Sequence, residues 1–415
     1  MNAYTMLFMA LVLLEVTARI GLSLRHIRHV AAHRDEVPSP FRHNIALEAH
    51  QKAADYTIAR VRIGLLDLTV GSLLLVVWTL GGGLEWLDHL WRAQGLSEPL
   101  TGTGFLLSAV LLMAVLELPL SAWRTFGIER RFGFNRTTPM TFLGDALKAG
   151  LLMALLGGPL AWLALTVMVN AGTFWWFWVW ALWLGFTLLV TWAFPTFIAP
   201  LFNRFAPLED PELRDRIEAL LERCGFHIDG IYVVDGSRRS SHGNAYFTGL
   251  GRTKRIVFYD TLLDQLAADE VEAVLAHELG HCCHHHVRKR LLLGGVVSLV
   301  GLAALGWLVG QPAFFTGLGI SQPSPHAALI LFMMVTPLLG LFLQPVSSWV
   351  SRRHEFEADD FATRETGARP LVEALVKLYR DNASTLTPDP LYSAFHDSHP
   401  PAPVRIAHLS SKMVG

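Results

Sequence analysis

The chain has 415 residues, of which 52% are hydrophobic and only 17% are charged. This balance is too apolar for an ordinary soluble enzyme and too charged for a bare bundle of membrane helices, so it indicates a membrane protein with a sizeable polar portion. The formal net charge of −1 gives no basic surface for nucleic acid, and three cysteines, two of them adjacent, do not make a disulfide framework.

Seven apolar stretches of about 20 residues each predict membrane-spanning helices. They cover residues 4–24, 63–81, 104–122, 150–170, 174–194, 291–310 and 327–346. The first stretch resembles a signal peptide, but it lacks a basic beginning and a small-residue cleavage site, so we expect it to be retained. Asp67 and Glu117 lie inside predicted spans and should face a bundle interior or a water-filled space, because a charge in lipid is costly.

The connections between the predicted spans are alternately rich and poor in lysine and arginine. Residues 25–62, 123–149 and 195–290 are rich in them, whereas 82–103, 171–173 and 311–326 together hold only Arg92. By the positive-inside rule, the N-terminus lies outside and the C-terminus lies in the cytosol. The richness in alanine, leucine and arginine and the compact loops favour a bacterial inner membrane as the location.

The chain divides into four expected parts. These are spans one to five with their loops (1–194), a cytosolic domain (195–290), spans six and seven (291–346) and a C-terminal cytosolic segment (347–415). In the cytosolic domain, Asp210 and Pro211 open a predicted helix. Residues 230–237 and 254–263 read as strands, 242–251 as a short edge strand, and 267–286 as a second helix.

The second cytosolic helix carries the motif HELGH at residues 277–281. His277 and His281 are one helical turn apart and face the same way, so both imidazoles can reach one metal ion. Glu278 lies beside the first histidine and can act on a metal-bound water without being a ligand. This is the arrangement of zinc peptidases, although the five-residue pattern alone is only moderate support.

A third ligand is expected just after the seventh span, in "SRRHEFEADDFA". Glu355 and Asp359 are four residues apart and share a helix face, whereas Glu357 points to roughly the opposite face. The hairpin of spans six and seven returns the chain to the same membrane face, which would bring Glu355 to the two histidines. Without those histidines, an ordinary acidic helix face would be the favoured interpretation.

Three further histidines follow the motif at 284–286. His284 continues the ligand face by one more turn, so a second metal site or a sensor is an option. Solvated or interfacial histidines are the favoured interpretation. Cys282 and Cys283 are interpreted as buried small residues rather than ligands.

Beyond HELGH, the chain resembles the type I CaaX prenyl proteases along nearly its whole length. The blocks that carry the resemblance include "QKAADYTIARVR", "GIERRFGFNRTTP", "SRRSSHGNAYFTGLGRTKRIVFYDTLL", "EVEAVLAHELGHCCHHH", "SRRHEFEADDFA" and "SHPPAPVRI". The resemblance implies a mostly α-helical integral membrane protein: seven transmembrane helices around a water-filled chamber, with a cytosolic zinc-metalloprotease domain that contains a small β-sheet. Such a chamber would account for Asp67 and Glu117.

The resemblance also implies roles for single residues. The positions that match the family's ligands for one zinc ion are His277, His281 and Glu355. Glu278 matches the catalytic base, and Asp359 is expected to orient a ligand histidine or to donate a proton. His399 and Arg405 match a histidine and an arginine near the zinc.

Two more positions and one departure follow from the same comparison. Asn244 and Ala245 fall in "NAYF", which resembles the edge strand that pairs with the substrate backbone. Cys282 stands where the family usually has a tryptophan, which puts local packing in question but not the metal ligands.

The expected function is that of a membrane-embedded zinc endopeptidase that hydrolyses peptide bonds by zinc-activated water. Its partners would be a peptide or protein substrate, with prenylation as an option, and membrane lipid. One alternative is a membrane-protein quality-control metalloprotease without prenyl dependence. Another, from a different class, is a metal-binding scaffold or transporter, but a transporter would place its ligands mid-bilayer rather than beyond the span ends.

Overall fold

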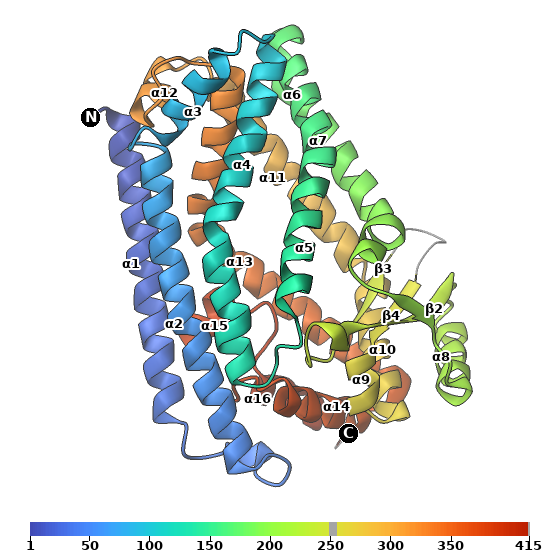
Figure 1. The fold of residues 1–415 in the computed structure, drawn as a ribbon. Coiled ribbons are helices and arrows are strands. Elements are labelled where there is room, and N and C mark those ends of the chain that lie inside the picture. Colours follow the sequence, from blue (N-terminus) through green and yellow to red (C-terminus); the bar gives the residue numbers. More distant parts are fainter. Residues whose placement is uncertain (249–254, 414–415) are drawn as a thin grey trace.

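The computed structural model describes residues 1–248 and 255–413 (Figure 1). Within them, seven helices are long and apolar enough to cross a membrane, which confirms the predicted number of spans. Their principal segments are α1 (Ala3–Ala32), α2 (Leu47–Trp78), α4 (Glu98–Trp123), α5 (Pro139–Leu152) continued by α6 (Gly158–Asn170), α7 (Trp175–Ala193), α11 (His286–Leu308) and α13 (Pro325–Thr366).

Several of these helices run well past the predicted spans. The helix α2 begins at Leu47 rather than near residue 63, and α13 continues to Thr366 although its apolar stretch ends near residue 346. An apolar window marks only the lipid-embedded part of a helix, while the backbone hydrogen bonds continue into polar sequence. The extension of α13 matters most, because it carries Glu355 and Asp359 on the same rigid rod as the seventh span.

Large apolar side chains cover the outside of the long helices. Leu73, Val115, Leu155, Trp178 and Leu292 are all exposed. A soluble protein rarely exposes so many, and lipid is the solvent that suits them.

The short helices gather at the two ends of the bundle (Figure 1). Near the N-terminus lie α3 (Gly83–Arg92) and α12 (Pro312–Gly317). At the other end, near the C-terminus, lie α14 (Ala368–Asp381) and α16 (Ala402–Ser411), with α15 (Pro390–His396) nearby. The two chain ends therefore lie at opposite ends of the bundle, as an odd number of spans requires.

A four-stranded sheet packs beside the bundle. Its strands are β1 (Phe205–Pro207), β2 (Gly230–Val234), β3 (Ala245–Thr248) and β4 (Arg255–Tyr259), in the order β1-β2-β4-β3. Only β2 and β4 pair in parallel. The three predicted strands correspond to β2, β3 and β4, with β3 at the edge as expected; the parts of those predictions at 249–254 lie outside the described residues. The strand β1 was missed, because three residues ending in proline show no alternation.

Three helices complete this region: α8 (Pro211–Arg223), α9 (Asp260–Gln265) and α10 (Ala268–Cys283). As predicted, Asp210 caps α8 and accepts hydrogen bonds from the backbone N–H groups of Glu212 and Leu213. The apolar face of α10, with Leu275 and Leu279, is buried in a core shared with the sheet and α8. That packing leaves the histidine face of α10 turned toward α13, which contacts it.

Candidate metal centre and active site

The helices α10 and α13 bring three predicted ligands together. The Nε2 atoms of His277 and His281 are 3.3 Å apart, and each lies 3.4 Å from an oxygen of Glu355. One nitrogen or oxygen atom from each residue lies within 4.8 Å of the others, close enough to share one ion.

The chemistry of this group fits zinc. Glu355 is only 4% exposed, and its Oε2 makes no hydrogen bond among the described residues but lies 3.4 Å from His277 Nε2 and 3.7 Å from an Arg405 nitrogen. A buried carboxylate is costly without positive charge beside it, and Arg405 is mainly engaged with Asp359, so a cation between Glu355 and the two histidines would lower that cost. Two imidazole nitrogens and one carboxylate are a common catalytic zinc set, which leaves a fourth position for water.

The central glycine of HELGH lets the two helices approach closely. A Cβ atom on Gly280 would lie 2.8 Å from the Cα of Ala358 and 3.1 Å from its carbonyl oxygen. Both partner atoms belong to the backbone of α13 and cannot swing away. Because α13 also carries Glu355, this contact fixes the distance between the ligands of the two helices.

A buried ion pair holds the first histidine. Asp359 Oδ1 lies 2.8 Å from His277 Nδ1, and Arg405 binds both carboxylate oxygens of Asp359, with 2.9 Å from Nε to Oδ2. Asp359 is fully buried and Arg405 is 6% exposed. The carboxylate can accept the Nδ1 proton, which leaves Nε2 free to face the metal position.

The same neighbours favour positive charge at His277. Burial lowers the pKa of this imidazole, but the neighbouring carboxylates of Asp359 and Glu355 outweigh burial and raise the pKa to about 9. The surroundings therefore stabilise a cation at this position, whether a proton or a metal ion supplies the charge.

Glu278 follows His277 on α10 and is partly buried. Among the described residues it has no ion-pair partner, unlike Glu355 and Asp359. A carboxylate directly beside a metal ligand is placed where a general base for a metal-bound water is expected.

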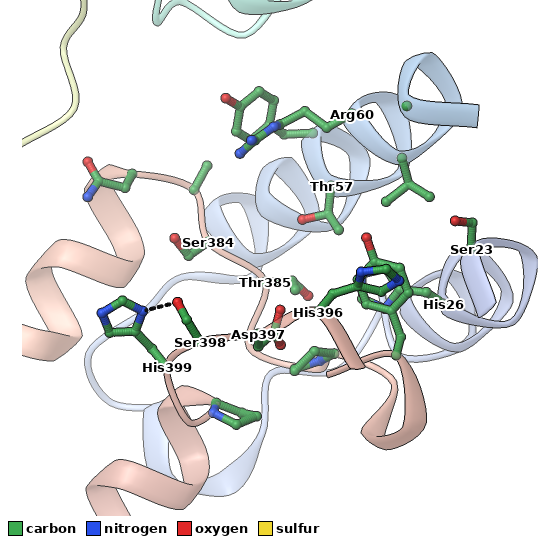
Figure 2. A pocket seen from close by; sticks show the side chains of 18 of the residues that line it. Ser23, His26, Thr57, Arg60, Ser384, Thr385, His396, Asp397, Ser398 and His399 are labelled. Carbon is green, nitrogen blue, oxygen red and sulfur yellow. Dashed lines mark hydrogen bonds between the residues drawn. The ribbon is translucent and has the colours of Figure 1, made fainter. Parts of the chain in front are cut away.

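His399 lies between the metal centre and a cavity. Its Nε2 is 3.4 Å from Glu355 Oε1, its Nδ1 is 3.0 Å from the Ser398 hydroxyl, and its side chain is 62% exposed. The cavity measures about 740 Å³ and is lined by parts of α1, α2 and the segment from Tyr379 to Pro401. Figure 2 shows His399 on one side of this cavity, with His26 and His396 together on the other.

The charged residues of the predicted spans behave differently from one another. Asp67 lines the cavity and forms an ion pair with Arg124 at 3.0 Å. Arg19 also lines it, paired with Glu15 at 3.0 Å. Glu117 is exposed on its helix and is not among the residues that line this cavity, so the expectation that it faces a water-filled space stays a prediction.

Among the described residues, the strand β3 pairs with no other strand on its side away from β4. Asn244 accepts a hydrogen bond from the backbone of Tyr259, and the Ala245 N–H is bonded to the Asn244 side chain rather than to β4. The strand also contacts α10, the helix of HELGH. The structure therefore places Asn244 and Ala245 at the sheet edge that adjoins the metal-binding helix.

The predicted helix over 267–286 breaks earlier than expected. The helix α10 ends at Cys283, His285 adopts a left-handed backbone conformation with φ of 56°, and α11 starts at His286. His284 is the C-cap of α10; it is not among the residues that could hold the metal, and its ring lies near those of His286 and Phe361. His285 is exposed as expected, but His286 is only 2% exposed and contacts His281.

Glu357 is not part of the group that could hold the metal, as expected. Its Oε2 nevertheless lies 3.0 Å from His286 Nε2, a contact that the sequence did not predict. The turn after α10 carries His286 around to meet α13, and sequence spacing alone gives no sign of that turn. Cys282 and Cys283 are partly buried.

Comparison with known proteins agrees with this architecture. A family model described as CAAX prenyl protease N-terminal, five membrane helices, matches residues 26–204, and the model of peptidase family M48 matches residues 207–413. The chain is 33% identical over 379 residues to a CAAX prenyl protease 1 homolog of Arabidopsis thaliana, with 89% of each chain covered. It is 37% identical over 315 residues to CAAX prenyl protease 1 of Saccharomyces cerevisiae, covering 72% of this chain and 69% of that one.

The fold is also similar to that of a solved structure. The crystal structure of S. mikatae Ste24p superposes with a TM-score of 0.91 at 29% identity, and 99% of each chain is covered. The metal-transporter and scaffold alternatives are not favoured by these relatives. The chain belongs to peptidase family M48, and it is a multi-pass membrane zinc metalloendopeptidase of the CAAX prenyl protease type that acts on peptide or protein substrates.

Proposed function

We propose that peptide bonds are cleaved at the centre formed by His277, His281 and Glu355, with Glu278 as the general base. The observation that carries the proposal is the buried Glu355 carboxylate, whose two oxygens each lie 3.4 Å from the Nε2 of a different histidine, His277 and His281. When bound there, zinc would lower the pKa of a water molecule and polarise the scissile carbonyl. Glu278 would take the proton from the attacking water and give it to the leaving amine.

His399 is the proposed donor to the carbonyl oxygen as that oxygen gains negative charge. Its position supports this role, because Nε2 faces Glu355 while most of the side chain is open to the cavity. Arg405 is better placed to position other groups, since it is buried and engaged with Asp359. In this scheme Asp359 and Arg405 act together by orienting His277.

The substrate backbone is proposed to lie along the free edge of β3. An extended peptide can add a strand to such an edge through main-chain hydrogen bonds. Asn244 and Ala245 would make the first of these contacts, beside the helix that carries Glu278.

The substrate is proposed to end in a CaaX sequence with a prenylated cysteine. The relatives are named CAAX prenyl proteases, and CaaX is a C-terminal motif that is prenylated on its cysteine. The cavity beside His399, of about 740 Å³, is within the usual size range for sites that enclose a small-molecule group. A surrounding lipid bilayer would supply such a substrate from its own surface.

The substrate proposal is tested by comparing the rates at which a farnesylated CaaX peptide and the same peptide without the farnesyl group are cleaved. We expect the purified protein to cleave the farnesylated peptide at least about tenfold faster, since each buried methylene contributes about 0.8 kcal/mol. Glu278→Gln is the inactive control. Equal rates would instead support a metalloprotease without prenyl dependence, acting in membrane-protein quality control.

The proposed location is a bacterial inner membrane, with the N-terminus outside and the C-terminus in the cytosol. The proposed organisation keeps residues 1–194 and 291–346 as the membrane part, with 195–290 and 347–415 as cytosolic segments. The alternation of basic connections supports this orientation. Reporter fusions at residues 95 and 415 would test it, because only the second should be active in the cytosol.

A further inference from the structure

The turn between α10 and α11 places a second pair of side chains behind His281. His281 Nδ1 lies 2.9 Å from His286 Nδ1, and His286 Nε2 lies 3.0 Å from Glu357 Oε2. On its other side, the Nε2 of His281 faces His277 and Glu355. One continuous line of contacts therefore leads from Glu357 to the metal position.

Only one arrangement of protons lets His281 bind a metal and keep every contact in this line. A metal at Nε2 of His281 requires the proton on Nδ1, which then donates to Nδ1 of His286. That nitrogen must be unprotonated, so His286 carries its proton on Nε2 and donates it to Glu357. The opposite arrangement would direct an N–H of His281 at the metal position.

The surroundings hold His286 in this orientation. The residue is 2% exposed, and its ring stacks on that of His354, with centroids 3.9 Å apart and an angle of 12° between the planes. Glu357 is 31% exposed and also contacts Arg353 at 3.3 Å, so its carboxylate stays charged in water while it faces the imidazole. A buried ring with both nitrogens engaged cannot rotate without losing two hydrogen bonds.

We propose that His286 and Glu357 are positioning residues of the metal centre, which hold His281 in its metal-binding tautomer. They would do for His281 what Asp359 and Arg405 do for His277. The inference rests on the proposed ligand role of His281. Loss of such an outer partner typically lowers metal affinity by about 10- to 100-fold.

The test is the zinc dissociation constant of the purified full chain, measured by competition with a chelator, together with the melting temperature of the metal-free protein. We expect His286→Ala to weaken zinc binding by about 10- to 100-fold with little change in that melting temperature. His286→Asn should recover most of the affinity, because an Asn oxygen can replace Nδ1 as the acceptor. His281→Ala is the reference for loss of a ligand.

Glu357→Ala is a second variant for the case that His286→Ala folds poorly. Because Glu357 is partly exposed, its replacement should disturb folding less. It should weaken zinc binding less than His286→Ala does, and it should add nothing in the His286→Ala background, because both act on one line of contacts. Arg353→Ala is the matched control: it removes the exposed ion pair of Glu357 and should leave zinc affinity unchanged.

Two outcomes would overturn the proposal. In one, His286→Ala and Glu357→Ala bind zinc as tightly as the unmodified chain. In the other, His286→Asn is as weak as His286→Ala and the metal-free melting temperature falls for both, which is the mark of a packing role. A different failure, zinc affinity unchanged in His281→Ala, would contradict the ligand set itself and is thereby distinguished.

Discussion

The two sides of the metal centre differ sharply in their exposure. On the side of α13 and α16, Glu355, Asp359 and Arg405 are 4%, 0% and 6% exposed. On the opposite side, the His399 side chain is 62% exposed and lines a cavity, and the outer edge of β3 pairs with no strand in the part of the chain that the structure describes. The closed side has no room for a substrate, so its residues hold the metal ligands, while the open side is where a peptide can enter.

The closed side gains its rigidity from charge pairs that depend on one another. Asp359 and Arg405 compensate each other in a buried place where either charge alone would be costly. Removal of one partner of a buried pair typically costs about 3–5 kcal/mol of folding free energy. Substitutions on the closed side should therefore disturb metal binding and stability, whereas those on the open side should disturb catalysis and substrate binding.

The largest expected effect comes from the closed side. Glu355→Ala should lose zinc and, with it, essentially all cleavage, because the centre would keep only two ligands. Metal analysis of the purified variant measures the loss. Asp360→Ala is the matched control, since the neighbouring Asp360 pairs with His408 and Lys412 and should leave zinc in place. Equal zinc content in the two variants would put the third ligand elsewhere.

Glu278→Gln should separate metal binding from chemistry. The variant should keep zinc but lose cleavage by about 100- to 10,000-fold, because an amide cannot accept the proton of the attacking water. Zinc content and turnover measured on the same sample decide the matter. Retained activity would exclude Glu278 as the base, and lost zinc would make it a ligand or a structural residue.

On the open side, His399→Ala should reduce turnover by about 100- to 1,000-fold while zinc stays bound and KM changes little. A donor to the developing negative charge acts mainly in the transition state, and the exposed side chain contributes little to folding. Kinetics corrected for folded protein, with a thermal melt, measure both properties. A lower melting temperature that explains the whole rate loss would make His399 a structural residue.

Arg405→Ala sharpens the comparison between the two sides. It should lower the melting temperature and zinc affinity together, as expected of the closed side. Because Arg405 is proposed to act through Asp359 and His277, its effect on the rate should be close to additive with that of His399→Ala, although both side chains also contact Glu355. Strong non-additivity would place both at the same oxyanion.

The smallest effect is expected at the sheet edge. Ala245→Pro removes an N–H that is bonded to Asn244 and not to β4, so the sheet should survive while a bound peptide loses one main-chain contact. We expect KM to rise by about 5- to 10-fold, equivalent to about 1 kcal/mol, with Ala245→Val, which keeps the N–H, as the control. An unchanged KM would move the substrate away from β3.

Sequence spacing predicted the parts of this centre that depend on regular helices. His277 and His281 follow from one helical turn, and Glu355 follows from a membrane hairpin that returns to the same face. The number of spans follows equally well from long apolar stretches, whereas the fold class as a whole was implied by the family resemblance. Helical spacing and apolar stretches extend over many residues, so one irregular residue does not change the prediction made from them.

The sequence could not predict contacts that depend on a single turn between two helices. His285 adopts a left-handed conformation without being a glycine, and this turn alone brings His286 to His281 and Glu357. The role of Gly280 is equally hidden, because it depends on how closely α10 approaches Ala358. Such contacts arise from tertiary packing, which residue spacing does not encode.

Removal and return of zinc tests the central claim most directly. The purified chain should contain one zinc ion, lose cleavage of a CaaX peptide when a chelator removes it, and regain cleavage in proportion to zinc added back, up to one ion per chain. Glu355→Ala should not regain activity under the same conditions. Full cleavage by metal-free protein, or recovery that requires two ions per chain, would contradict a single centre built from His277, His281 and Glu355.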